Sequence, residues 1–188
     1  MKNLLNIFPV ILILSLLPVS CKKDKNEITS YFKINDTTYE LARGTLENYG
    51  TDDWYDGYNL DLTLISDGIN GDNYYDWTGS GKAIYFEMFS SSYTYLANGE
   101  YEYDDVSDIL PTFTFDYSDF STNWIDTATT HTWISLVSGV VSVARDGDTY
   151  SITLTGGEDV YGSTVTAKYT GTLKYLDYTS KKSAKTRH

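Results

Sequence analysis

Two short stretches of the sequence combine acidic or amide side chains with aromatic ones, the combination that proteins use to bind sugars. They are TDDWYDGY, residues 51–58, and SDGINGDNYYDWTGSG, residues 66–81. Aromatic rings can lie against the C–H faces of a sugar, while carboxylates and amides bond its hydroxyl groups. These stretches therefore predict a glycan- or peptide-binding rim, whose candidate residues are Trp54, Tyr55, Tyr74, Tyr75 and Trp77. The alternative interpretation is that Asp, Asn and Gly form turns while the aromatic side chains close the ends of the core.

The second stretch also carries enough oxygen atoms for a calcium site to be considered. Its candidate ligands are Asp67, Asn70, Asp72 and Asp76, and calcium takes about six to eight oxygen ligands. Their spacing departs from the helix–loop–helix calcium pattern, because an isoleucine and a glycine occupy two of its ligand positions. The other interpretation is that the negative charge keeps a surface β-protein soluble and protects its strand edges.

Few side chains in this sequence could carry out catalysis. The chain has one cysteine and only two histidines, His131 and His188. A zinc site or a Cys–His pair therefore lacks partners. Two carboxylates can hydrolyse a glycosidic bond without histidine, and Glu87 and Glu102 are the candidates for that role. We expect both to be outward-facing strand residues, and we expect the protein to be no enzyme and to need no cofactor.

Strand patterns account for most of the chain after residue 27. In residues 58–66, leucines alternate with polar residues, which is the period of a half-buried strand. Residues 31–41 predict a hairpin, with its turn at Asn35 and Asp36. Residues 138–175 predict three strands joined by hairpin turns at Asp146–Gly147 and at residues 159–162.

Two further segments predict which side chains share a face of the sheet. Residues 82–90, KAIYFEMFS, are apolar on both sides, which favours a central strand covered on both faces. In residues 111–118, PTFTFDYS, three rings alternate with polar residues. This alternation places Phe113, Phe115 and Tyr117 on the same face.

About eight to ten short strands separated by turn signals favour an all-β domain. We predict an antiparallel β-sandwich with a C-terminal three-strand meander. A lipocalin-like β-barrel is the alternative, because the meander suits either architecture. The predicted β domain covers residues 28–177, and the basic tail of residues 178–188 is expected to be disordered.

The only cysteine of the chain, Cys21, follows an almost wholly apolar run from Leu4 to Val19. The run is short and contains two prolines, so it is typical of a secretory signal rather than of a membrane-spanning helix. A hydrophobic run followed by Val19, Ser20 and Cys21 resembles the lipobox of bacterial lipoproteins, with Pro18 standing where the usual pattern has Leu. The alternative is an ordinary signal peptide followed by a cysteine by chance.

The lipobox resemblance implies a division of the N-terminal region. Residues 1–20 are then a lipoprotein signal peptide, and residues 21–27 are a polar tether. The Cys21 thiol and the new amino terminus would carry fatty acyl chains such as palmitate, and two or more such chains anchor a protein stably to a membrane.

The charge distribution limits the partners of the folded part. Between Glu27 and Ser180 the chain has 25 acidic residues and six basic ones. A body this acidic repels phosphate backbones, which excludes nucleic acid as a partner. The basic tail could instead contact anionic lipid headgroups.

Residues 96–103, LANGEYEY, followed by a terminal meander ending in YTGTL, resemble uncharacterised surface lipoproteins of the Bacteroidota. The resemblance implies an all-β lipoprotein of the outer membrane, facing either the cell surface or the periplasm, and it supplies no catalytic residue. We therefore expect a lipid-anchored, non-catalytic binding module, with glycan as the leading ligand. The rivals are a structural or assembly subunit that contacts another envelope protein, and a carrier of a small hydrophobic ligand inside a barrel.

Overall fold

The computed structural model describes residues 29–128 and 132–180, and the all-β prediction is confirmed for them. Cys21, the signal peptide, the tether, His131 and His188 lie outside the described residues. The strands are β1 (Tyr31–Ile34), β2 (Thr37–Glu40), β3 (Arg43–Asp52), β4 (Tyr55–Ile65), β5 (Ile69–Asn70), β6 (Thr78–Ser90), β7 (Gly99–Tyr103), β8 (Thr114–Ile125), β9 (Ile134–Asp146), β10 (Thr149–Asp159) and β11 (Thr164–Asp177). A 3₁₀ turn, η1 (Tyr74–Asp76), precedes β6. No helix in this part of the chain is long and apolar enough to cross a membrane.

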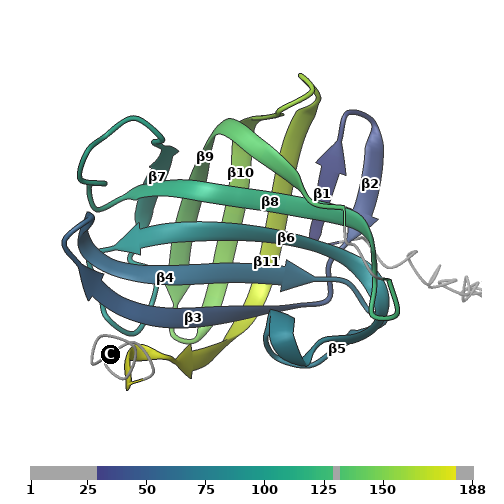
Figure 1. Ribbon diagram of the computed structural model, residues 1–188, viewed down its shortest axis with the longest axis horizontal. Helices are drawn as coiled ribbons and strands as arrows, with labels where there is room; N and C mark the ends of the chain where they lie inside the picture. Colours follow the sequence, from purple (N-terminus) through teal and green to yellow (C-terminus); the bar gives the residue numbers. More distant parts are fainter. Residues whose placement is uncertain (1–28, 129–131, 181–188) are drawn as a thin grey trace, which may run out of the picture.

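The strands form one sheet that closes on itself (Figure 1). Around the ring the neighbours are β3, β4, β6, β8, β7, β9, β10 and β11, and β11 pairs with β3. In Figure 1, β3, β4, β6 and β8 form the front layer, and β9, β10 and β11 cross behind them. The closed ring supports the barrel alternative rather than the antiparallel β-sandwich that we predicted from the sequence.

The direction of the closing pair follows from the number of strands. Leaving β7 aside, the chain runs up and down through β3, β4, β6, β8, β9, β10 and β11. With an odd number of alternating strands, the first and last must point the same way. The β11–β3 pair is accordingly parallel, from Leu173 opposite Gly44 to Asp177 opposite Asn48. The short strand β7 lies between β8 and β9, where these two strands separate.

Side chains fill the inside of the barrel. Among the described residues, twenty-two buried ones form one hydrophobic cluster, as expected for an eight-stranded barrel, whose interior is just wide enough for side chains. The leucines of β4 (Leu60, Leu62 and Leu64) all point inward, which confirms their predicted alternation. Phe32 of the β1–β2 hairpin enters the same cluster, with its ring 6.0 Å from that of Phe120.

The C-terminal meander is confirmed. Strands β9, β10 and β11 pair antiparallel in chain order, and their turns follow Asp146 and Asp159 as predicted. Tyr178, the first residue of the predicted tail, stacks on Tyr49 at 5.5 Å between ring centroids.

One predicted face was wrong. In the β6–β8 pair, Phe86 is opposite Ser118 whereas Met88 is opposite Phe115, so β8 contains an extra residue at this point. A bulge of this kind reverses the alternation of side chains. Phe115 therefore points into the core, while Tyr117 is 58% exposed on the outside of the barrel.

Candidate functional site

A groove of about 430 Å³ lies on the outer face of β3, β4, β6 and β8. The alternation of the strands places its residues opposite the core, because their neighbours along each strand point inward. Its aromatic lining consists of Tyr49, Tyr85 and Tyr117 on the strands and of Tyr74, Tyr75, Trp77 and Trp133 at one end. Its acidic lining consists of Glu47, Asp61 and Asp119. No lysine or arginine is among the described residues that line it.

Three carboxylates lie side by side across neighbouring strands, and we call them the carboxylate row. Glu47 of β3 pairs with Asp61 of β4, and Asp61 pairs with Glu87 of β6. Side chains directly opposite each other in an antiparallel pair have Cβ atoms about 4.5–5.5 Å apart, and like charges there are destabilising. The stability of the sheet therefore does not explain why these three residues are acidic.

Asp61 occupies the centre of the row and is held by two donors. Its Oδ2 accepts a hydrogen bond from the Tyr85 hydroxyl at 2.7 Å, and its Oδ1 accepts one from Asn59 Nδ2 at 2.9 Å. Burial, followed by the charge of Glu87, raises the pKa of Asp61 from 3.8 to about 8, although the two hydrogen bonds act in the opposite direction. Its surroundings therefore favour the protonated form of this carboxyl more than water does.

Two tyrosines of the groove, Tyr49 and Tyr85, lie next to members of the carboxylate row. The Tyr49 hydroxyl donates to Glu47 Oε2 at 2.8 Å, and burial, then the charge of Glu47, raise the pKa of Tyr49 well above its usual value. Tyr85 is opposite Asp119 in the β6–β8 pair. Tyr85 therefore lies between the carboxylate row and a fourth acidic side chain.

Two buried polar atoms of the lining have no hydrogen-bond partner within the described part of the chain. They are Oδ1 of Asp119 and Nε1 of Trp77, in side chains that are 6% and 5% exposed. A buried polar group without a partner costs about 1–3 kcal/mol. Neither atom is accessible to solvent, so a ligand in the groove would reach them only if neighbouring side chains moved.

A small cluster of tryptophans forms the apolar end of the groove. The ring of Trp77 lies 5.3 Å from that of Trp124 and 6.4 Å from that of Trp133. Arg43 of β3 holds the loop that carries Trp77, because its Nη2 donates to the carbonyl oxygens of Ile69 at 2.6 Å and of Gly71 at 3.0 Å. The aromatic end is thus built on a positioned loop.

The five aromatic residues predicted from the sequence do not form one rim. Tyr74, Tyr75 and Trp77 line the groove. Trp54 and Tyr55 lie at the opposite end of β4, an 11-residue strand that spans roughly 35 Å. Trp54 is 72% exposed there, and the ring of Tyr55 lies 4.8 Å from that of Phe89 in a tilted arrangement. The turn-and-core interpretation therefore suits Tyr55, and in part Trp77, whose indole is almost fully buried.

Sequence reasoning missed the groove residues that lie on strands. Asp61 and Tyr85 were considered only as members of strands, yet both are outward-facing polar residues beside acidic neighbours. Glu87, named as a candidate carboxylate, does belong to the carboxylate row, whereas Glu102 lies on β7 away from it. One signal in the sequence could have revealed the row. The leucine-rich strand β4 and the phenylalanine-containing strand β6 each have an acidic residue, Asp61 and Glu87, at an outward position.

The loop considered for calcium is organised by other partners. No group of three or more acidic, histidine or cysteine residues that could hold a metal ion occurs within the described ranges. Arg43 occupies two carbonyl oxygens of the loop, Asp72 forms an ion pair with Lys174, and Asp76 Oδ2 accepts from Asn73 Nδ2 at 2.6 Å. This loop therefore gives no support to a calcium site at Asp67, Asn70, Asp72 and Asp76.

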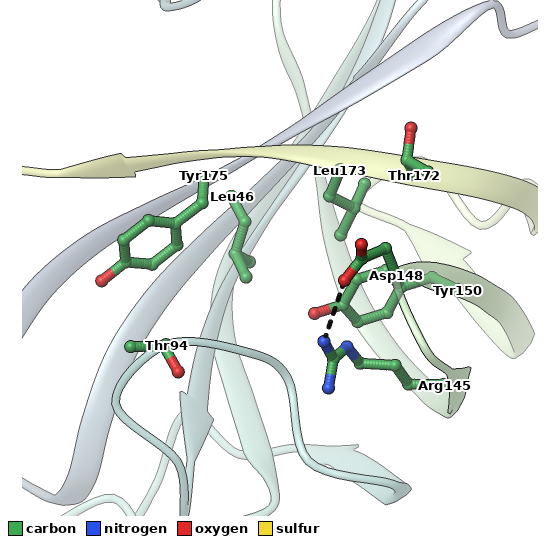
Figure 2. A pocket seen from close by; sticks show the side chains of 8 residues that line it. All are labelled: Leu46, Thr94, Arg145, Asp148, Tyr150, Thr172, Leu173 and Tyr175. Carbon is green, nitrogen blue, oxygen red and sulfur yellow. Dashed lines mark hydrogen bonds and ion pairs between the residues drawn. The ribbon is translucent and has the colours of Figure 1, made fainter.

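A second cavity, of about 310 Å³, lies at the end of the barrel beside the β9–β10 turn. Figure 2 shows the Arg145 side chain directed towards Asp148, and Leu46 and Leu173 line the same cavity. Arg145 Nη2 is 3.4 Å from Asp148 Oδ1, its guanidinium lies 4.7 Å from the centre of the Tyr95 ring, and its Nε is buried without a partner in the described structure. This pocket places a cation beside apolar side chains of the barrel.

No protein-family model, no curated protein and no solved structure matches this chain. The geometry of the groove and of the second cavity is therefore what bears on function.

Proposed function

We propose that this protein is a lipid-anchored component of the outer membrane, attached through acylated Cys21, and that its barrel is a non-catalytic module that binds glycan in the outer groove. The observation that carries the binding proposal is the combination within one groove. The exposed side chains of Tyr75 and Tyr117 line the same groove as the acidic side chains of Glu47, Asp61 and Asp119. Acidic side chains can accept hydrogen bonds from sugar hydroxyls while the C–H faces of the ring lie on the aromatic side chains.

The binding test uses exposed aromatic residues, so that loss of folding does not confuse the result. Tyr75 is 91% exposed and Tyr117 is 58% exposed. On a glycan array followed by calorimetry, Tyr75→Ala and Tyr117→Ala should each weaken binding about five- to tenfold, or about 1–1.4 kcal/mol. Trp54→Ala is the matched control, because Trp54 is equally accessible but lies at the far end of β4. Its binding should be unchanged.

Two results would exclude a glycan site in the groove. One is the absence of any glycan ligand, and the other is a loss of binding in Trp54→Ala but not in Tyr75→Ala. Co-purification with an outer-membrane protein that persists in Tyr75→Ala would favour the rival assembly role. For the anchor, Cys21→Ser should move the protein from the membrane fraction to the soluble fraction.

The cavity at the barrel end favours a second candidate function. We propose, as the alternative, that the protein has a lipocalin-like architecture and carries a small hydrophobic anion, with its charged group at Arg145. The pocket supports this because the Arg145 side chain and the apolar side chains of Leu46 and Leu173 line the same cavity. A long-chain fatty acid should then bind the wild type and bind Arg145→Gln at least about tenfold more weakly. Equal binding by both proteins would contradict this candidate.

A further inference from the structure

We propose that this protein binds a second protein through an exposed apolar patch at one end of the barrel, and that the partner presents lysine or arginine side chains around an apolar surface. The patch consists of Trp54, Val106 and Ile109, and we call it the Trp54 patch. It is separate from the groove, so this inference goes beyond the proposed glycan binding.

Two connections between strands come together to form the patch. Trp54 is in the β3–β4 hairpin, whereas Val106 and Ile109 are in the connection between β7 and β8. Figure 1 shows the two connections meeting at the left end of the barrel. The Leu110 amide donates to the Trp54 carbonyl oxygen at 3.0 Å, and a parallel bridge joins Tyr55 to Leu110. The residues before this bridge, Trp54 and Ile109, are therefore neighbours across it.

The three side chains of the patch are in contact with water to an unusual extent for their types. Trp54 is 72% exposed, Val106 is 86% exposed and Ile109 is 54% exposed. Apolar side chains that gather on a surface with a polar rim mark interaction sites, and tryptophan is enriched among the residues that dominate protein–protein binding. Val106 and Ile109 offer no flat face to a sugar ring. The patch therefore suits the apolar side chains of another protein.

The connection that carries two of these side chains is held in one shape. Asp104 Oδ1 accepts hydrogen bonds from the amides of Val106 and Ser107, each at 3.0 Å. At the other end of the connection, Thr114 Oγ1 donates to the Pro111 carbonyl oxygen at 2.6 Å. A surface that is already ordered loses little conformational entropy when a partner binds.

The charge around the patch identifies the kind of partner. Residues 44–81 and 83–144 contain no lysine or arginine. The same two connections carry four exposed carboxylates, on Asp53, Asp56, Asp105 and Asp108. This rim repels anionic lipid headgroups and also a second copy of the chain, which would bring an identical rim. It attracts a basic protein surface, and such complementarity speeds association and suppresses wrong partners.

The position of the patch leaves it open to a partner. The Leu41 amide donates to the Ser30 carbonyl oxygen at 3.0 Å, so the first described residues lie beside the start of β3. The hairpin that carries Trp54 follows the other end of β3, a ten-residue strand that spans roughly 33 Å. A protein attached through Cys21, as proposed above, therefore presents the Trp54 patch at the end of the barrel remote from its attachment.

The experiment uses three synthetic peptides that share an apolar centre of leucine and phenylalanine. They differ only in their flanking residues, which are lysine, glutamine or glutamate. Full-length protein in phosphatidylcholine nanodiscs is titrated into each labelled peptide, with empty nanodiscs as the blank. We expect the lysine peptide to bind at least about tenfold more tightly than the other two, and to bind more weakly as the salt concentration rises. Trp54→Ala should weaken its binding at least about tenfold, and Val106→Ser at least about threefold.

Matched variants separate the charge of the rim from the charge of the whole protein. Asp53→Asn combined with Asp108→Asn should weaken the lysine peptide at least about fivefold and leave the glutamine peptide unchanged. Asp36→Asn combined with Glu40→Gln removes the same charge from exposed residues of the β1–β2 hairpin, and it should change nothing. Tyr75→Ala, in the groove, should also bind the lysine peptide as the wild type does.

Several results would overturn the inference. They are a lack of binding by all three peptides, equal binding of the lysine and glutamine peptides, and full binding of the lysine peptide by Trp54→Ala. A dimer in sedimentation that Trp54→Ala abolishes would assign the patch to a second copy, and Trp54-dependent binding to phosphatidylcholine vesicles would assign it to a membrane. Tighter binding of the lysine peptide by a chain ending at Ser180 would assign it to the basic tail. A failure of glycan binding leaves this inference standing, because different variants test the groove and the patch.

Discussion

The raised pKa of Asp61 makes the stability of the protein depend on pH in a way that one substitution should remove. An aspartate in the unfolded chain ionises near its usual value of 3.8, whereas in the folded protein the pKa of Asp61 is about 8. Between these values the folded state binds a proton that the unfolded state has lost. The contribution of Asp61 to stability is therefore greatest below about pH 4, and it declines as the pH rises towards about 8.

The size of this effect follows from the two pKa values. Stability falls by about 1.4 kcal/mol for each pH unit over which only the folded state is protonated. The full interval, from 3.8 to about 8, gives an upper limit of about 6 kcal/mol. Asp61 lies on an open groove and is only partly buried, so water moderates the effect, and we expect about 2–4 kcal/mol between about pH 4 and about pH 8.5.

Asp61→Asn is well suited to this test because the amide fits the same partners. Its Oδ1 can still accept from Asn59 Nδ2, and its new NH₂ group can donate to the Tyr85 hydroxyl, where Asp61 Oδ2 accepts in the wild type. The variant carries no charge at this position at any pH. It should therefore gain stability relative to the wild type by about 2–4 kcal/mol as the pH is raised across this interval.

The assay is urea denaturation of wild type and variant at five or six pH values, read as the difference in free energy of unfolding. Asp104→Asn is the control of opposite sign. Hydrogen bonds from Ser107 and from the backbone of Val106 lower the pKa of Asp104, so that variant should lose stability relative to wild type as the pH rises through the acid range. A difference between wild type and Asp61→Asn that stays constant across the pH range would refute the reasoning.

Two further predictions concern the barrel that carries the groove. Phe32→Ala should lower the free energy of unfolding by about 3–5 kcal/mol, because its ring is fully buried against Tyr39 and Phe120. Urea denaturation measures this change. A loss below about 1 kcal/mol would mean that the β1–β2 hairpin does not close the core. Gly44→Ala should cost about 1–3 kcal/mol, because its Cβ would lie 2.5 Å from Leu173 Cδ2 and 2.6 Å from Leu64 Cδ2 at the parallel seam. An unchanged unfolding midpoint would show that the two leucine side chains move aside at no cost.

The sequence predicted the elements whose signals are local. The leucines of β4 alternate because only one face of that strand is packed in the core, and this pattern is visible in a nine-residue window. The turn at Asp146–Gly147 was equally readable, since Gly147 has a φ of 59°, a conformation that glycine adopts without steric cost. These local signals were sufficient for the all-β fold and for the C-terminal meander.

Closure of the barrel has no such local signal. It depends on the pairing of residues 173–177 with residues 44–48, segments that are more than a hundred residues apart in the chain. The direction of that pair depends on the number of strands between them, which a sequence pattern gives only approximately. A sandwich and a barrel therefore looked alike from the sequence.

The groove was hidden for a related reason. Tyr117 faces it only because of the bulge in β8, and without that bulge the ring would point inward, as we predicted. Asp61 and Tyr85 are 24 positions apart and meet through the register of β4 and β6. Composition alone, by contrast, grouped Trp54 with Trp77, which lie at opposite ends of β4.

The carboxylate row can persist because the inner face of the same strands offsets its cost. Leu46, Leu60, Leu62 and Phe86 are the immediate chain neighbours of the row, and each is at most 1% exposed. Full burial of one such side chain contributes about 1.5–3 kcal/mol, so a few of them outweigh a penalty of the size worked out for Asp61. Because side chains alternate along a strand, a residue that lines the outer groove is followed directly by one that packs in the core. We therefore expect substitutions in the row to alter ligand affinity and pH dependence, and substitutions one position away to alter stability.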